Sequence, residues 1–115
     1  MRWWVAAGLQ GCVPCTGEVV PVEAGGPLAP GESRALVFRY RDEVAAGPDD
    51  CGGYWEVDGV EGGDAAVGTI TDCGVYVAPA VPPDADPVVL AALDAPGTCA
   101  DCCPHGTYVV PLDRR

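Results

Sequence analysis

Glycine and proline interrupt this chain throughout its length, with 16 Gly and 12 Pro among 115 residues. Both break regular secondary structure, because Gly is conformationally too free and Pro lacks a backbone N–H donor. The segments between them are short, which favours strands over helices. An apolar fraction of 49% separates the chain from disordered polypeptides. The sequence therefore predicts one small all-β domain.

The charge balance limits the partners of this domain. The formal net charge is −11, and the six cationic side chains, all Arg, are scattered along the chain. No basic face is available to neutralise phosphates, so we expect no nucleic-acid partner. We interpret the acidic residues as a solvated surface.

Two segments show the alternation of a strand with one buried face. In residues 33–42 and 54–58, large apolar side chains occupy every second position. We expect these faces to pack together in the core of the domain. The predicted core residues are Leu36, Phe38, Tyr40, Trp55, Val57 and Tyr76.

Five further short segments complete the predicted strands, at residues 18–22, 67–70, 75–78, 87–93 and 107–112. Pro21 places the first of them at the edge of a sheet, because Pro cannot donate to a neighbouring strand. Residues 45–53 and 95–106 are predicted loops, and residues 59–63 form a predicted turn. About seven short strands at regular spacing are typical of a Greek-key β-sandwich.

The middle of the chain carries a recognisable pattern. Residues 55–63 read WEVDGVEGG, residues 67–70 read VGTI and residues 74–79 read GVYVAP. This pattern resembles the bacterial immunoglobulin-like domains of surface proteins, over residues 18–112. The resemblance implies an immunoglobulin-like sandwich with Trp55 between its sheets, and a role in adhesion, spacing or display at the cell surface. Fold alone does not choose among those roles.

The N-terminus resembles a bacterial lipoprotein signal peptide. Arg2 precedes the apolar residues 3–9, and Leu9-Gln10-Gly11-Cys12 fits the lipobox. The resemblance implies export to the cell envelope or cell surface, with lipid on Cys12 as a membrane anchor. Residues 1–12 are then a signal segment and residues 13–115 the domain. In the alternative interpretation, residues 3–9 form an ordinary first strand.

The chain has seven cysteines. Because disulfides use cysteines in pairs, an exported protein with an odd number has one left over that needs another role. If Cys12 carries lipid, six remain for three disulfides. The predicted topology places the cysteine-bearing loops and the chain entry at one end of the sandwich, where the sulfurs can meet. Connectivity stays open, although an adjacent Cys102–Cys103 pair would be strained. The predicted disulfide cysteines are Cys15, Cys51, Cys73, Cys99, Cys102 and Cys103.

A zinc site is the rival interpretation of the same residues. Cys12-x-x-Cys15 and Cys99-x-x-Cys102, with Cys103 and His105 nearby, have zinc-ribbon spacing. The chain would then be a small cytosolic β domain stabilised by zinc. A four-ligand site leaves Cys51 and Cys73 unused, so we favour disulfides and expect no metal or other cofactor.

The sequence offers little material for catalysis. It contains one His, His105, and one Ser, Ser33, in distant parts of the predicted topology, and no Lys. Its paired glycines are followed by no helix that could bind phosphate. We therefore expect no enzymatic activity. The predicted function is binding, adhesion or assembly with other envelope or filament proteins.

Overall fold

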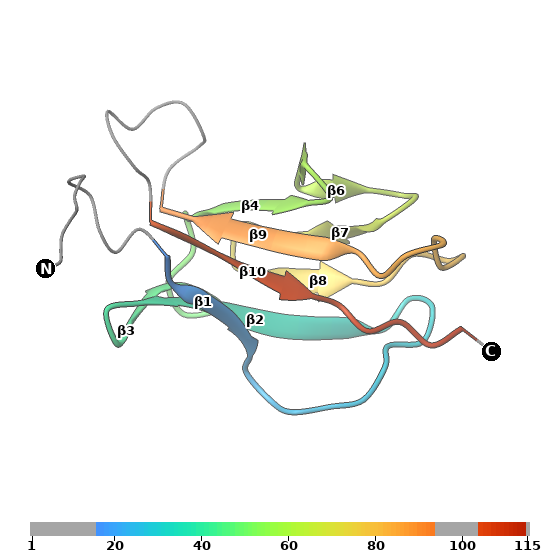
Figure 1. Ribbon diagram of the computed structural model, residues 1–115, viewed down its shortest axis with the longest axis horizontal. Helices are drawn as coiled ribbons and strands as arrows, with labels where there is room; N and C mark the ends of the chain where they lie inside the picture. Colours follow the sequence, from blue (N-terminus) through green and yellow to red (C-terminus); the bar gives the residue numbers. More distant parts are fainter. Residues whose placement is uncertain (1–15, 94–103, 115) are drawn as a thin grey trace, which may run out of the picture.

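The computed structural model describes residues 16–93 and 104–114, which contain ten strands and no helix (Figure 1). The strands are short, as the spacing of Gly and Pro requires. Their bounds are β1 Glu18–Pro21, β2 Ser33–Tyr40, β3 Glu43–Ala46, β4 Tyr54–Val57, β5 Val60–Glu61, β6 Gly63–Asp64, β7 Gly68–Ile70, β8 Val75–Val77, β9 Val88–Ala92 and β10 His105–Val109.

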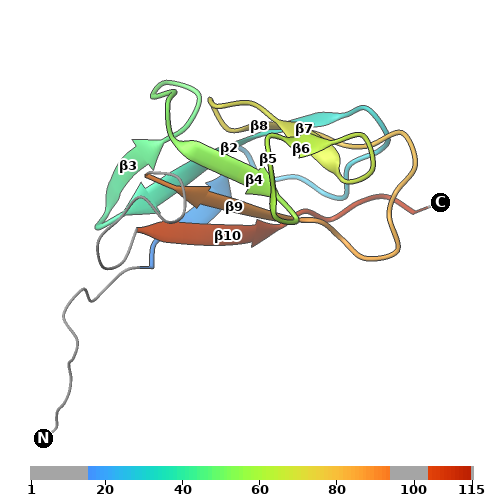
Figure 2. The same cartoon turned by 90° about the horizontal axis from the view of Figure 1, so that it is seen from above.

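These strands form two antiparallel sheets that pack face to face (Figures 1 and 2). The first sheet has the order β1-β2-β8-β7-β6, with β3 also paired to β2, and the second has the order β10-β9-β4-β5. This is the Greek-key order of an immunoglobulin-type sandwich, with three short additional strands, β3 beside β2, β5 beside β4 and β6 beside β7. Pro21 lies in β1 at the edge of its sheet, as predicted.

Three strands lie where the sequence predicted loop or turn. β3 overlaps the start of the predicted loop 45–53, and β5 and β6 fall at the predicted turn 59–63. Arg41 and Asp42 have φ of 56° and 65°, which folds the chain back onto β2 through a two-residue turn. Positive φ is uncommon for an Arg-Asp pair, so the sequence carried no signal for this hairpin. β10 also begins at His105, earlier than the predicted strand 107–112.

The core lies between the two sheets and contains five of the six predicted residues. Leu36, Phe38, Val57 and Tyr76 are fully buried and Trp55 is 3% exposed. Tyr40 differs, because it lies at the end of β2 and is only partly buried against the core margin. Alternate residues of the facing strands supply these side chains, as the period of a strand dictates.

Backbone hydrogen bonds also join the two sheets along β1 and β10. The Gly17 N–H donates to the His105 carbonyl at 2.7 Å, and the Leu28 N–H donates to the Pro111 carbonyl at 2.9 Å. The described chain enters the sandwich at Thr16 and leaves it at Arg114, at the opposite end (Figure 1). No helix in the described part of the chain is long and apolar enough to cross a membrane.

Candidate functional site

The loops at one end of the sandwich meet around the start of β4. Register pairs Tyr54 with Ala92 and Ala92 with His105, so β4, β9 and β10 are neighbours there. Thr16 pairs with His105 at the same place. We call this region the loop end: Thr16 and Gly17, residues 47–53, residues 71–74, Ala92 and His105.

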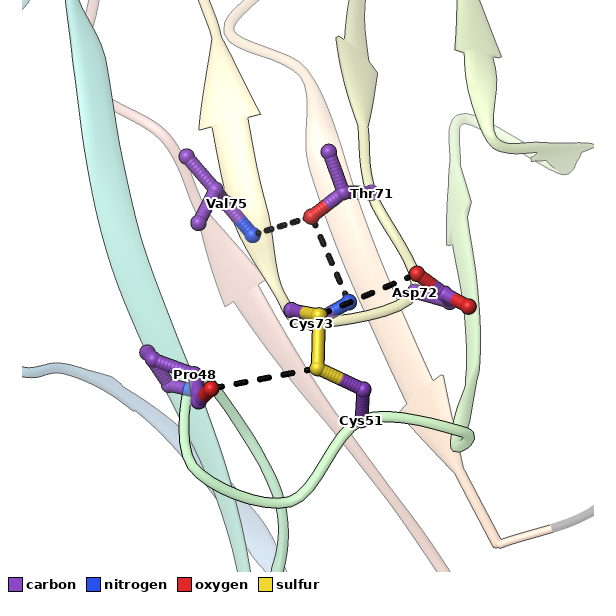
Figure 3. Close-up of a disulfide and its surroundings, with 6 residues drawn as sticks. All are labelled: Pro48, Cys51, Thr71, Asp72, Cys73 and Val75. Atoms are coloured by element: carbon purple, nitrogen blue, oxygen red, sulfur yellow. Dashed lines mark hydrogen bonds between the residues drawn. A yellow bond between two sulfur atoms is a disulfide. The ribbon is translucent and has the colours of Figure 1, made fainter.

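A disulfide joins two of these loops (Figure 3). Cys51 and Cys73 are 22 residues apart in sequence, with sulfurs 1.91 Å apart and Cα atoms 4.2 Å apart. The bond links the connection between β2 and β4 to the turn between β7 and β8. Cys51 is exposed and Cys73 is half-buried. The structure thus pairs two of the six predicted disulfide cysteines, whose connectivity the sequence had left open.

The turn that carries Cys73 is fixed by its own side-chain and backbone hydrogen bonds. The Thr71 Oγ1 accepts from the N–H of Cys73 at 3.3 Å and of Val75 at 3.1 Å (Figure 3). The Gly74 N–H donates to the Thr71 carbonyl at 2.9 Å. Gly74 has a φ of 81°, which L side chains rarely adopt. These hydrogen bonds and the conformation of Gly74 hold Cys73 within the turn.

The loop that carries Cys51 is fixed in a similar way. Gly47 and Asp50 exchange backbone hydrogen bonds of 3.1 and 3.0 Å around Pro48 and Asp49. Pro at the second position of such a turn is favoured because its φ is already set. The Gly52 N–H then donates to the Asp72 carbonyl at 3.2 Å, which brings the loop to the partner turn.

The surroundings of the disulfide are polar and acidic. The Cys51 Sγ lies 3.8 Å from the Pro48 carbonyl oxygen, and the Cys73 Sγ lies 3.8 Å from the Asp72 Oδ1 (Figure 3). An oxidised sulfur has no proton to donate, so these are contacts and not hydrogen bonds. We expect the negative charge of Asp72 to disfavour the approach of a thiolate to this bridge.

The other predicted cysteines, Cys12, Cys15, Cys99, Cys102 and Cys103, lie outside the described residues. Lipidation and the remaining bridges therefore stay predictions. The described residues on either side of them do lie at the loop end. Thr16 pairs with His105, and the Leu93 N–H donates to the Pro104 carbonyl at 3.3 Å.

Ser33 and His105 lie far apart in the structure. Ser33 begins β2 and pairs with Val77 at the far end of the sandwich, whereas His105 lies at the loop end. Tyr76 is unsuited to proton transfer near neutral pH, because burial raises its pKa to about 12. Within the described ranges, no three His, Cys, Asp or Glu side chains come together in a way that could hold a metal ion.

An apolar groove lies beside the loop end, on the outer face of the first sheet. It has a volume of about 370 Å³ and is lined by the side chains of three valines and, as a fourth part, by a turn. We call it the valine groove. Its residues are Val22, Val37, Val44 and residues 47–50. The valine groove was not predicted, because no pattern in the sequence indicated β3 and Val44 therefore had no place on the sheet.

No family model, curated protein or solved structure matches this chain.

Proposed function

We propose that this chain is a non-catalytic, disulfide-stapled immunoglobulin-like module of the bacterial cell surface. It is anchored through lipid on Cys12 and acts in binding, adhesion or the assembly of envelope or filament proteins. The Cys51–Cys73 disulfide is the observation that carries this proposal. Disulfides persist in oxidising compartments and are rare in the cytosol, so the bridge favours export.

The bridge also narrows the proposed pairing of the remaining cysteines. With Cys12 lipidated and Cys51 bound to Cys73, four cysteines remain, Cys15, Cys99, Cys102 and Cys103. If an adjacent pair is excluded by strain, Cys15 must pair with Cys102 or Cys103. Either pairing ties the chain entry to the connection between β9 and β10. The Thr16–His105 pair supports this, because it holds the described neighbours of those cysteines together.

The position of Thr16 supports the proposed anchor as well. Cys12 precedes Thr16 by four residues, and an extended chain of that length reaches at most about 14 Å. A lipid on Cys12 would therefore hold the loop end close to the membrane surface. The far end, where Arg114 forms an ion pair of 2.7 Å with Asp86, would face outward.

Cell fractionation in a bacterial host that processes lipoproteins tests the proposal. We expect the unaltered protein in the membrane fraction, with an intact mass that includes acyl chains on Cys12. The Cys12→Ala variant should move to the soluble fraction, because the acyl chains are the anchor. The matched control is Gln10→Ala, at the variable lipobox position, which should stay in the membrane fraction. A membrane-bound Cys12→Ala variant, or an unmodified Met1 terminus, would contradict the proposal.

A further inference from the structure

We infer that the valine groove is a docking site for an extended segment of a partner protein that presents an aliphatic side chain between basic residues. This inference rests on the proposed function, because it names the partner chemistry of the binding module. Four features of the groove carry it: its apolar walls, its size, its rigid turn and the charge of its rim.

The walls are apolar side chains that the fold leaves exposed. Val22 is 51% exposed and Val44 is 49% exposed, on either side of the half-buried Val37. Val22 follows the end of β1, Val44 lies in β3 and Val37 lies in β2, so three segments converge on one surface. When a partner covers apolar side chains on a concave surface, their removal from water lowers the free energy of the complex.

The size of the groove limits what it can hold. Its volume of about 370 Å³ is at the lower end of the range for ligand cavities, about 300–1,000 Å³. One or two aliphatic side chains fit such a space, whereas the face of a globular domain does not. The occupant is therefore an extended segment that inserts a side chain.

The fourth side of the groove is a turn that is held in place before any partner arrives. Gly47 and Asp50 close the turn through reciprocal backbone hydrogen bonds. Gly47 lies directly on the groove floor, since a Cβ at that position would be 2.7 Å from the Val37 Cγ1. The Cys51–Cys73 bridge fixes the residue that follows. A preformed groove loses little conformational entropy on binding.

The rim is acidic. Asp49 and Asp50 are exposed on the turn, and the whole chain has a formal net charge of −11. Arg39 pairs with Val44 in register, but Glu18 is its neighbour on the other side, in β1. Lys or Arg beside the inserted side chain would complement the two aspartates. A second copy of this chain, with the same net charge of −11, would be repelled.

Peptide titrations of the oxidised, 15N-labelled full chain test the inference. The probes are Gly-Lys-Val-Leu-Val-Lys-Gly and its acidic counterpart Gly-Glu-Val-Leu-Val-Glu-Gly. We expect sub-millimolar binding of the basic peptide, at least fivefold tighter than that of the acidic one. The largest amide shifts should occur at Val37, Val44 and Asp49. In 0.5 M salt the difference between the peptides should shrink, because the rim charges are exposed.

Two variants assign the binding to the groove. Val44→Ser should weaken binding of the basic peptide at least fivefold. The matched control is Val109→Ser, the same change at a valine that is 57% exposed on the second sheet, and it should leave binding unchanged. Replacing Asp49 and Asp50 by Asn should reduce the preference for the basic peptide to less than twofold. Thermal melts of each variant establish that it is folded.

Three results would overturn the inference: equal affinity for both peptides, no binding of either, or shifts confined to the second sheet. Unchanged binding by folded Val44→Ser would do the same. The fractionation of Cys12→Ala does not depend on the groove. If the protein is lipid-anchored but binds neither peptide, only the docking inference is wrong. If it carries no lipid but binds the basic peptide, the docking inference stands and the proposed anchor is wrong.

Discussion

Trp55 and Gly74 together show how single residues determine the packing of this sandwich. The indole of Trp55 is 3% exposed, and within the described residues its Nε1 is buried without a hydrogen-bond partner. Its ring lies against the backbone of Gly74, since a Cβ there would be 2.8 Å from the Trp55 Cζ2. The large side chain on β4 therefore fits only because the turn before β8 has none.

The Gly74→Ala variant tests that fit. A Cβ at this position would also lie 2.7 Å from the Leu36 carbonyl, at a φ of 81°. We expect a loss of about 1–2 kcal/mol from the backbone conformation and about 1–3 kcal/mol more from overpacking. The matched control is Gly31→Ala, with a φ of 80° and open space around it, which should show the first loss alone. Guanidinium denaturation measures both, and equal losses would contradict the packing.

Ionisation of Tyr76 lowers the stability of the fold at alkaline pH. Burial raises its pKa to about 12 from 10, and its hydroxyl donates to the Val67 carbonyl at 2.6 Å. The folded state therefore holds the proton more tightly than the unfolded state. The stabilisation is fully present below pH 10 and is lost as pH rises toward 12.

The Tyr76→Phe variant separates this contribution from other alkaline effects. It should be less stable than the unaltered protein at pH 8, because the hydrogen bond is missing. Its free energy of unfolding should then fall less between pH 9 and pH 11.5. Urea denaturation across this range provides the comparison. Parallel pH profiles for the two proteins would be inconsistent with a raised pKa at Tyr76.

At the scale of elements, alternation predicted the strands that contribute most to the core. The predicted ends of β2 and β4 lie within two residues of the observed ends. The side chains of these strands that face the other sheet are buried: Leu36, Phe38, Trp55 and Val57. β3 and β5 follow two-residue turns at positive φ, formed by Arg41-Asp42 and Asp58-Gly59. A single sequence does not show which of these turns is stabilised by pairing within a sheet. For this reason neither β3 nor the groove beside it was predicted.

The site was predictable only in outline. Loop placement indicated that Cys51 and Cys73 share one end of the sandwich, but six cysteines allow 15 pairings. What selects the partner is local geometry: the positive φ of Gly52 and Gly74, and the hydrogen bonds of Thr71 to its turn. Those features depend on contacts between loops distant in sequence, which spacing alone does not reveal.

Removing the bridge tests its contribution to these elements. Replacing Cys51 and Cys73 together by Ser should lower the free energy of unfolding by about 3 kcal/mol, because the bond closes a loop of 22 residues. The core should remain folded, since its buried side chains do not include the two cysteines. Chemical denaturation of the double variant, with the unaltered oxidised protein as control, measures the loss. A stability unchanged within about 0.5 kcal/mol would count against a bridge in solution.

At the scale of the whole molecule, the parts are arranged along one axis. The described chain enters at the end of the sandwich that carries the Cys51–Cys73 bridge, and it leaves at the far end through Arg114. In the proposed orientation, the lipid anchor and the covalent cross-links share the membrane-facing end. The valine groove lies beside that end on the outer face of the first sheet. The acidic surface leaves basic segments as the complementary partners.

Mapping the cysteines by non-reducing peptide mass spectrometry tests the central claim most directly. The sample is protein from the envelope of a bacterial host, alkylated before digestion and analysed for zinc. We expect a Cys51–Cys73 peptide, Cys15 linked to Cys102 or Cys103, and no free thiol among the six cysteines. Alkylated Cys51 and Cys73, together with one bound zinc per chain, would contradict it and favour the zinc-stabilised cytosolic domain.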